Sequence, residues 1–412
     1  MDYSKPVDAE LFPEGCERCS LTKFTGWMSI LGVVFLWGLY AAVRILGFGL
    51  GETGMDDYFG FGLWITFDLA VIALGAGAFF TGALRYILNI DELKNIVNLA
   101  AVIGFLCYTG AMMILVLDIG QPIRCWFGYW YPNVHSMLTE VIFCITCYCI
   151  VLILEFVPLV LENRQLMKKP FIHALAHNFH VYMPIFAGIG AFLSTFHQGS
   201  LGGMYGVLFG RPYLFREGFF IWPWTFFLFV LSAVASGPMF TVLVCTLMEK
   251  MSGRKLVSWN VKQLMGKIAG TMFTIYMVFK LIDTAGWVMD ILPRSGMTFD
   301  QMFHGWIYGK WLLFAELVVC GVLPAYLLFS KKCRSNPALF YLGGILACVG
   351  VTINRYVMTV QALAIPVMPS TRGNSTIPTG PNGARPSWSS PTRGFALPSL
   401  TAIFPCSRRN VS

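Results

Sequence analysis

The chain alternates between long apolar runs and short polar segments. An apolar run of about 20 residues is long enough to cross the hydrocarbon core of a bilayer as an α-helix. Nine runs approach this length, so the pattern predicts an all-α polytopic membrane protein. The predicted spans lie near residues 24–47, 62–88, 95–118, 137–161, 182–197, 220–248, 267–292, 311–330 and 338–360.

The composition supports this fold class. Hydrophobic residues make up 56% of the 412 residues, and charged residues make up only 12%. A soluble protein of this length cannot bury so much apolar surface, so lipid must be the solvent for most of the chain. The 12 cysteines fall mostly within apolar runs, where cysteine acts as a small hydrophobe. We therefore expect no disulfide framework.

The basic residues are unevenly distributed between the two sets of loops. The net charge of +8 does not indicate a nucleic acid partner, because these residues are dispersed among short loops. The loops after spans two, four, six and eight hold eleven of them, and the opposite set holds five, namely Arg124, Arg211, Arg216, Arg294 and Lys310. The positive-inside rule therefore predicts a bacterial cytoplasmic (inner) membrane protein with its N-terminus in the cytoplasm.

Three pairs of similar motifs, which occur in the same order in both halves of the chain, predict an internal repeat. Gly77-Ala-Phe-Phe-Thr81 in span two is echoed by Gly237-Pro-Met-Phe-Thr241 in span six. Asp118, Pro122 and Arg124 are echoed by Asp290, Pro293 and Arg294, and Glu140 by Glu316. Both copies start from the same side, which is typical of a parallel repeat about the membrane normal. We expect two four-helix bundles plus one or more extra transmembrane helices.

The predicted organisation follows from these spans and from the polar ends. Residues 1–23 lack the apolar core and cleavage site of a signal peptide, and are expected to form a cytoplasmic segment. The other predicted parts are a first helix with its periplasmic loop (24–61), a first bundle (62–197), a periplasmic connection (198–219), a second bundle (220–366) and a disordered or atypical tail (367–412). The tail is rich in Pro, Ser, Thr and Gly, which cannot bury a core.

Several ionisable and polar side chains are predicted to lie within the membrane, where each is a candidate for function because its insertion is costly. They are Asp68 in span two, Asp118 and Arg124 around the loop between spans three and four, His135, Ser136 and Glu140 at the start of span four, and His197 and Gln198 at the end of span five. The predicted orientation places all of them in the periplasmic half.

A quinone fits this collection of side chains. Its reduction requires two electrons and two protons, and its carbonyl groups require hydrogen-bond donors that can titrate, for which histidine is suited. Carboxylates such as Asp68 and Glu140 are candidates for relaying protons. Trp126 and Tyr131 suit a flat ring and an isoprenoid tail. The alternative for these aromatic residues is an interfacial belt, which membrane proteins show anyway.

Other polar residues have competing interpretations. Lys280 and Asp283 lie three residues apart in span seven, where they either neutralise each other or belong to a proton path. His135 and His197 are the periplasmic candidates for ligating one haem, but histidine cannot ligate two haems in this chain, because the cytoplasmic candidates lie on span five only. We expect no metal, haem or iron–sulfur cluster in this chain.

Three motifs resemble those of the NrfD/PsrC family of integral membrane subunits. Leu117-Asp-Ile-Gly-Gln-Pro-Ile-Arg-Cys-Trp126 resembles the loop after the third helix of that family. Leu193-Ser-Thr-Phe-His-Gln-Gly-Ser-Leu-Gly202 is similar to a stretch of its longer members, and Asn354-Arg355-Tyr356 to an element of their ninth helix. Together these motifs cover residues 24 to about 366.

The resemblance implies a function and a set of partners. It implies two four-helix bundles without bound haem and a menaquinone pocket near the periplasmic face. It also implies a docked periplasmic iron–sulfur subunit, with a molybdopterin-family subunit and a multihaem cytochrome c behind it. The implied pocket residues are Asp118, Arg124, His135, Ser136, Glu140 and His197, with Asp68 on a proton path.

The chain departs from the family pattern in its tail and at Gln121. Longer members have a tenth helix after the Asn-Arg element, which residues 369–412 cannot provide, so we hypothesise that this segment is altered or read in another frame. Gln121 stands where many relatives have a basic residue. Three other readings stay open: quinol oxidation in the reverse direction, a structural membrane anchor, and a secondary transporter.

Overall fold

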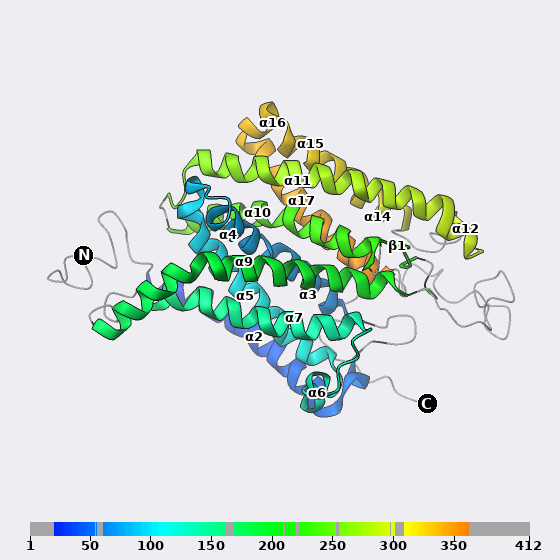
Figure 1. The fold of residues 1–412 in the computed structure, drawn as a ribbon, viewed down its shortest axis with the longest axis horizontal. Coiled ribbons are helices and arrows are strands. Elements are labelled where there is room, and N and C mark those ends of the chain that lie inside the picture. Colours follow the sequence, from blue (N-terminus) through cyan, green and yellow to red (C-terminus); the bar gives the residue numbers. More distant parts are fainter. Residues whose placement is uncertain are drawn as a thin grey trace.

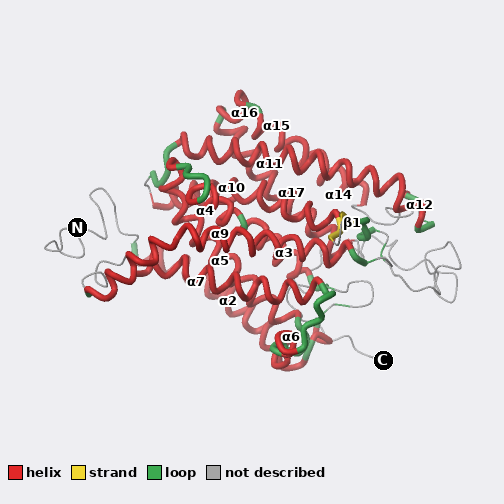
Figure 2. Tube along the Cα trace, in the orientation of Figure 1, coloured by secondary structure: helices red, strands yellow, loops and turns green. Residues whose placement is uncertain are grey.

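The computed structural model describes residues 20–361, except 54, 56–60, 162–168, 209–210, 212, 220–221, 253–254, 297 and 301–308. Within these residues, long helices run side by side along one direction (Figure 1). The described loops gather mainly at the two ends of the helices (Figure 2). The predicted N-terminal segment and the predicted tail lie outside the described residues, apart from Ser20–Lys23.

The first half of the chain forms a separate helix and a group of four helical segments, the first bundle. The separate helix, α2 (Leu21–Phe48), buries only Ala41 and Ile45 against the rest of the described chain. The group consists of α3 (Leu63–Gly75) with α4 (Gly77–Tyr86), α5 (Lys94–Asp118), α7 (Met137–Leu161) and α9 (Pro170–Gly206). A short helix, α6 (Phe127–Trp130), lies between α5 and α7, and the 3₁₀ turns are η1 (Leu50–Glu52), η2 (Asp91–Leu93) and η3 (Pro122–Arg124).

The second half forms another group of four helical segments, the second bundle. They are α10 (Trp224–Ser252); α11 (Trp259–Gly286) with η4 (Trp287–Ile291) and α12 (Leu292–Arg294); α14 (Gly309–Phe314) with η5 (Ala315–Val322) and α15 (Leu323–Phe329); and α17 (Pro337–Tyr356) with η6 (Val357–Gln361). The segments η4, η5 and η6 are π-helical. A small helix, α16 (Lys331–Ser335), precedes α17, and the strands β1 (Gly218–Phe219) and β2 (Trp222–Pro223) pair before α10.

The predicted membrane class is confirmed. Seven helices in the described part of the chain are long and apolar enough to cross a membrane, and α9, which bends by 46° between Phe179 and Val181, makes an eighth candidate. These eight correspond to eight of the nine predicted spans. The helix α11 forms at the place of the seventh span, but it carries Lys267, Lys280 and Asp283 and is not among the eight. Its role as a span stays a prediction.

The predicted end of the fifth span was wrong. The sequence pattern ended it at His197 and began a connection at residue 198, but α9 continues to Gly206. The glycines in this part of α9 serve close packing, because a Cβ atom at Gly202 would lie 2.3 Å from the carbonyl oxygen of Thr225 on α10. His197 and Gln198 therefore lie inside a helix that packs between the two groups of helices.

The repeated glycine motifs meet where the two groups of helices cross. A Cβ atom at Gly77 would lie 2.2 Å from the carbonyl carbon of Gly237, and one at Gly237 would lie 2.2 Å from the Cα of Gly77. Thr81 donates to the carbonyl oxygen of Gly77 (2.7 Å), and Thr241 donates in the same way to Gly237 (3.1 Å). A two-fold axis between the predicted repeats would bring equivalent residues into contact, as Gly77 and Gly237 are here.

We expect Gly77→Ala to destabilise the protein, because the added methyl group has no room against the backbone of Gly237. Overpacking of this kind costs about 1–3 kcal/mol. Unfolding in detergent, followed by circular dichroism, measures the loss. The control is Gly82→Ala, five residues along α4, where a Cβ atom would make an ordinary contact of 3.8 Å with Ala187. Equal stability of the two variants would contradict the close crossing.

Candidate functional site

The centre of the first group of helices holds a buried polar cluster around His197. The side chains of His197 and Gln198 are 0% and 2% exposed. Gln198 donates through Nε2 to the hydroxyl of Tyr108 on α5 (3.5 Å), and that hydroxyl lies 3.3 Å from Ser194 Oγ. The ring centroids of Tyr108 and His197 are 5.9 Å apart. Neither ring nitrogen of His197 has a hydrogen-bond partner in the described part of the chain, and neither has Gln198 Oε1.

A second polar cluster lies towards the end of α5, between α3 and α9. Trp64 donates through Nε1 to the carboxylate of Asp118 (3.0 Å), which interacts electrostatically with Asp68. Asp68 is 2% exposed, and Tyr205 on α9 is 1% exposed and interacts with both carboxyl groups. Asp68 Oδ1 and the Tyr205 hydroxyl are also without a hydrogen-bond partner among the described residues. The structure thus brings together Asp68 and Asp118, two of the residues that the sequence singled out.

Glu140 lies at the rim of these clusters. Its half-buried carboxyl group, at the start of α7, interacts with the hydroxyl of Ser200 on α9. Ser200 is fully buried, one helical turn after His197. The carboxyl group of Glu140 is therefore placed between the buried helix face that carries His197 and the surroundings of the protein.

The other predicted site residues do not join the buried clusters. Arg124 and His135 are exposed, as are Trp126 (49%) and Tyr131 (81%). Ser136 is half-buried, and its backbone begins the turn into α7. The aromatic side chains here pack mainly on each other, with Trp126 and Phe127 centroids 4.2 Å apart. This arrangement favours an interfacial aromatic belt over a ring pocket that shares these side chains with His197.

The predicted neutralisation of Lys280 by Asp283 was wrong. Lys280 forms an ion pair with Glu316 of η5 (3.2 Å), and Asp283 forms one with Arg216 from the segment between α9 and α10 (2.9 Å). Both carboxylates are nearly fully buried. Sequence spacing could not give these partners, because they come from other segments that pack on α11. The buried carboxylates of Asp283 and Glu316 are thus each paired with a cation.

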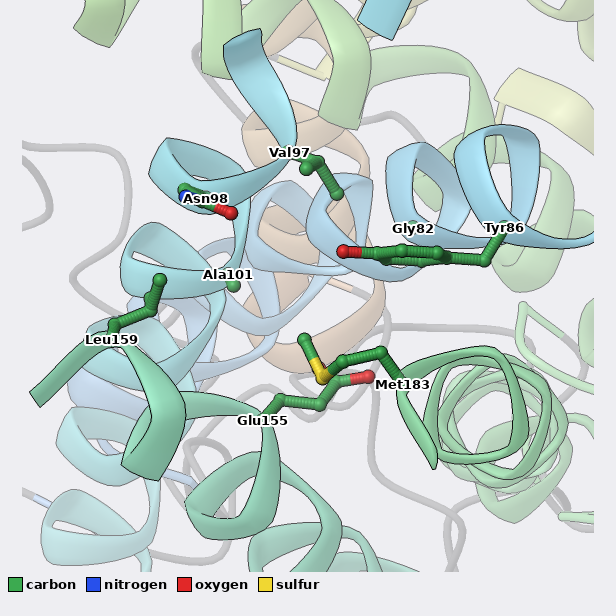
Figure 3. A pocket seen from close by; sticks show the side chains of 8 residues that line it. All are labelled: Gly82, Tyr86, Val97, Asn98, Ala101, Glu155, Leu159 and Met183. Carbon is green, nitrogen blue, oxygen red and sulfur yellow. The ribbon is translucent and has the colours of Figure 1, made fainter. Parts of the chain in front are cut away.

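Glu155, which is 8% exposed in α7, was not predicted from the sequence as a site residue. Its side chain lines a small pocket between helices of the first bundle (Figure 3). The other lining residues are Gly82, Tyr86, Val97, Asn98, Ala101, Leu159 and Met183. A carboxylate inside an apolar run was the signal that selected Asp68, and it would have selected Glu155 as well. Tyr108 and Tyr205 carry no such signal, because buried tyrosine is common.

The described residues contain no group of three or more His, Cys, Asp or Glu side chains suited to a metal ion. His197 is also the one fully buried histidine among the side chains that the structure describes. Its two unpartnered nitrogens suit hydrogen bonding to an organic ligand. His135, the other candidate for ligating one haem, is exposed and lies apart from the buried cluster of His197.

Comparison with known proteins identifies the family. The family described as "Polysulphide reductase, NrfD" matches residues 51–367. The chain is 75% identical to the "Menaquinone reductase, integral membrane subunit" of Nitratidesulfovibrio vulgaris over 378 residues, which are 92% of this chain and 90% of the relative. It is 21% identical to a selenate reductase subunit of Mesobacillus selenatarsenatis over 365 residues, which are 82% of each chain.

The family match spans more than half of the chain and includes every motif on which the resemblance rested. The helical structure has the polytopic character of such membrane subunits. The protein therefore belongs to the polysulphide reductase NrfD family.

Proposed function

We propose that the protein is the quinone-binding membrane subunit of a respiratory redox complex, and that it reduces menaquinone at the buried clusters of the first bundle. The observation that carries this proposal is the set of unpartnered buried polar atoms on His197, Gln198, Asp68 and Tyr205. Each buried polar atom without a partner costs about 1–3 kcal/mol. A ligand with two carbonyl oxygens, which become hydroxyl groups on reduction, supplies partners of both kinds.

The proposed chemistry adds two electrons and two protons to the quinone, which gives the quinol. The electrons come from an iron–sulfur partner. His197 and Gln198 bind and orient the ring, and Asp68 and Asp118 hold protons close to it. Glu140 is placed to pass protons between the rim and Ser200. We assign Lys280 and Asp283 to ion pairing, because each has its own buried partner.

An open apolar groove on α9 suits the isoprenoid tail. It is lined by Thr195, Trp224, Phe226, Phe227, Val230, Leu231 and Phe279. Thr195 lies two residues before His197 on α9, on a different face of the helix. Phe226 packs so tightly on α9 that a Cβ atom at Gly199 would lie 2.3 Å from its ring. The groove thus runs along the helix that carries the proposed ring-binding residues.

The similarity to the menaquinone reductase subunit supports the quinone and the direction of electron flow that we propose. We place the site near the periplasmic face of the cytoplasmic membrane, because the helix ends around it adjoin the loops that are poor in basic residues. We propose a periplasmic iron–sulfur subunit as the docked partner, with a molybdopterin-family subunit and a multihaem cytochrome c behind it. The exposed segment around Arg124, Trp126, Tyr131 and His135 is the surface that we assign to docking.

We expect His197→Gln to lower menaquinone-dependent turnover of the intact complex at least tenfold, because a glutamine side chain does not place its hydrogen-bonding atoms where the imidazole nitrogens lie. A tenfold loss equals about 1.4 kcal/mol, within the range for one buried hydrogen bond. Turnover and quinone titration in proteoliposomes measure the effect. His177→Gln, at an exposed position on the same helix, is the control and should stay within about twofold of the wild type. Unchanged binding and turnover in His197→Gln would leave an anchor as the better description.

The proposed orientation predicts the labelling of single thiols. In a background without the exposed Cys125 and Cys147, a membrane-impermeant maleimide should label Asn133→Cys from the periplasmic side. Ser258→Cys, ahead of α11, should react only after the inner membrane is opened. Both positions are exposed, so access to the thiol is not limited by packing. The reverse labelling pattern would place the site at the cytoplasmic face.

A further inference from the structure

Arg355 is a buried cation without a carboxylate partner among the described residues. Its side chain is 1% exposed, at the end of α17. It donates to three neutral oxygens: Asn354 Oδ1 (2.6 Å), Ser232 Oγ (2.9 Å) and the carbonyl of Phe229 (3.5 Å). Its Nε has no partner in the described part of the chain. A buried charge without a counter-charge is strongly destabilising, so we expect a negative charge close to Arg355.

The carboxylates of the second bundle are already paired. Asp283 is paired with Arg216, and Glu316 is paired with Lys280 and also accepts from the side chain of Asn354 (2.8 Å). Glu316 also attracts Arg355 electrostatically. The two ion pairs nevertheless use two cations and two anions, so Arg355 is an excess positive charge in the second bundle. The first bundle shows the opposite imbalance, because Asp68 and Asp118 lie together there without a cation in an ion pair among the described residues.

The packing places Arg355 against the first-bundle site. Its guanidinium carbon lies 3.5 Å from the centroid of the Phe229 ring, and the Tyr205 ring centroid lies 6.5 Å from the same ring. Tyr205 in turn interacts electrostatically with Asp68 and Asp118. Phe229 thus separates the cation of one bundle from the polar cluster of the other.

A hydrogen bond between two side chains joins the bundles beside these charges. The hydroxyl of Thr359 in η6 donates to the carbonyl oxygen of Arg355 (2.8 Å). Thr359 therefore accepts from the hydroxyl of Thr66 (2.6 Å), which lies two residues before Asp68 on α3.

We propose that Arg355 is the counter-charge of the first-bundle site and makes that site selective for a ring that carries negative charge. The inference rests on the proposed function. Electrons from an iron–sulfur donor reach the ring before both protons do, so the ring is transiently anionic until two electrons and two protons have been added. A fixed cation behind Phe229 stabilises the anionic ring without touching it, which makes Arg355 a positioning residue rather than a catalytic one.

Two ring probes test this charge selectivity in the intact complex. One is 2-methyl-1,4-naphthoquinone, which is neutral, and the other is 2-hydroxy-1,4-naphthoquinone, which is an anion at neutral pH. We expect Arg355→Gln to bind the anion at least tenfold more weakly and the neutral ring within about threefold of the wild type. Arg355→Lys keeps the charge and should bind both rings within about threefold.

Arg334→Gln is the matched control. Arg334 is also a buried arginine (8% exposed) whose described partners are backbone carbonyls, those of Leu328 and Phe329, but it lies at the other end of the second bundle. Its loss should not change the preference between the two rings. An equal loss of anion affinity in Arg334→Gln and Arg355→Gln would overturn the proposal.

A second variant decides the matter if Arg355→Gln does not assemble. Asp118→Asn removes one negative charge from the site and keeps an oxygen for the hydrogen bond from Trp64. It should raise affinity for the anion several-fold relative to affinity for the neutral ring. Unaltered preference in Asp118→Asn would refute charge selectivity. Failure of the wild-type complex to bind either ring would instead refute the proposed function.

Discussion

The structure depends on the absence of hydrogen-bonding partners in the lipid. Every polar group on a membrane-spanning helix must be satisfied by another part of the protein or by a ligand. In the second bundle the protein pairs the buried carboxylates with cations, as Arg216–Asp283 and Lys280–Glu316 show, and leaves Arg355 without a carboxylate in an ion pair among the described residues. In the first bundle, polar atoms of His197, Gln198 and Asp68 stay unpartnered among the described residues. The first bundle thus offers unpartnered donors and acceptors that suit a ligand.

The two bundles reach these different ends from similar positions along the chain. Glu140 and Glu316 occupy corresponding places in the predicted repeat, yet Glu316 is sealed by Lys280, whereas Glu140 is half-buried beside a serine hydroxyl. The close crossing at Gly77 and Gly237 holds the bundles together near their shared axis. Next to the crossing helices, the ring of Phe229 lies between Arg355 of the second bundle and Tyr205 of the first.

Sequence patterns predicted the helices better than they predicted the site. Long apolar runs gave the spans because the bilayer fixes the required length, and Asp68 and Asp118 were recognised because carboxylates in such runs are costly. The prediction failed at the end of the fifth span. The apolar run ends near His197, but α9 continues to Gly206 and packs closely on α10 through its glycines. Arg124, Trp126, Tyr131 and His135 were grouped with His197 because all were predicted to lie at the periplasmic side, and the structure places these four on an exposed segment.

The sequence by itself determined the solvent of this protein and the positions of most of its helices along the chain, because these depend on local composition alone. Only the tertiary structure decided which polar groups meet. A helix fixes the height of a side chain, but its rotation and its neighbours fix the partner, and these come from packing between distant segments. Lys280 therefore binds Glu316 rather than the nearby Asp283, and Arg355 interacts both with Glu316 of its own half of the chain and with Tyr205 of the other half.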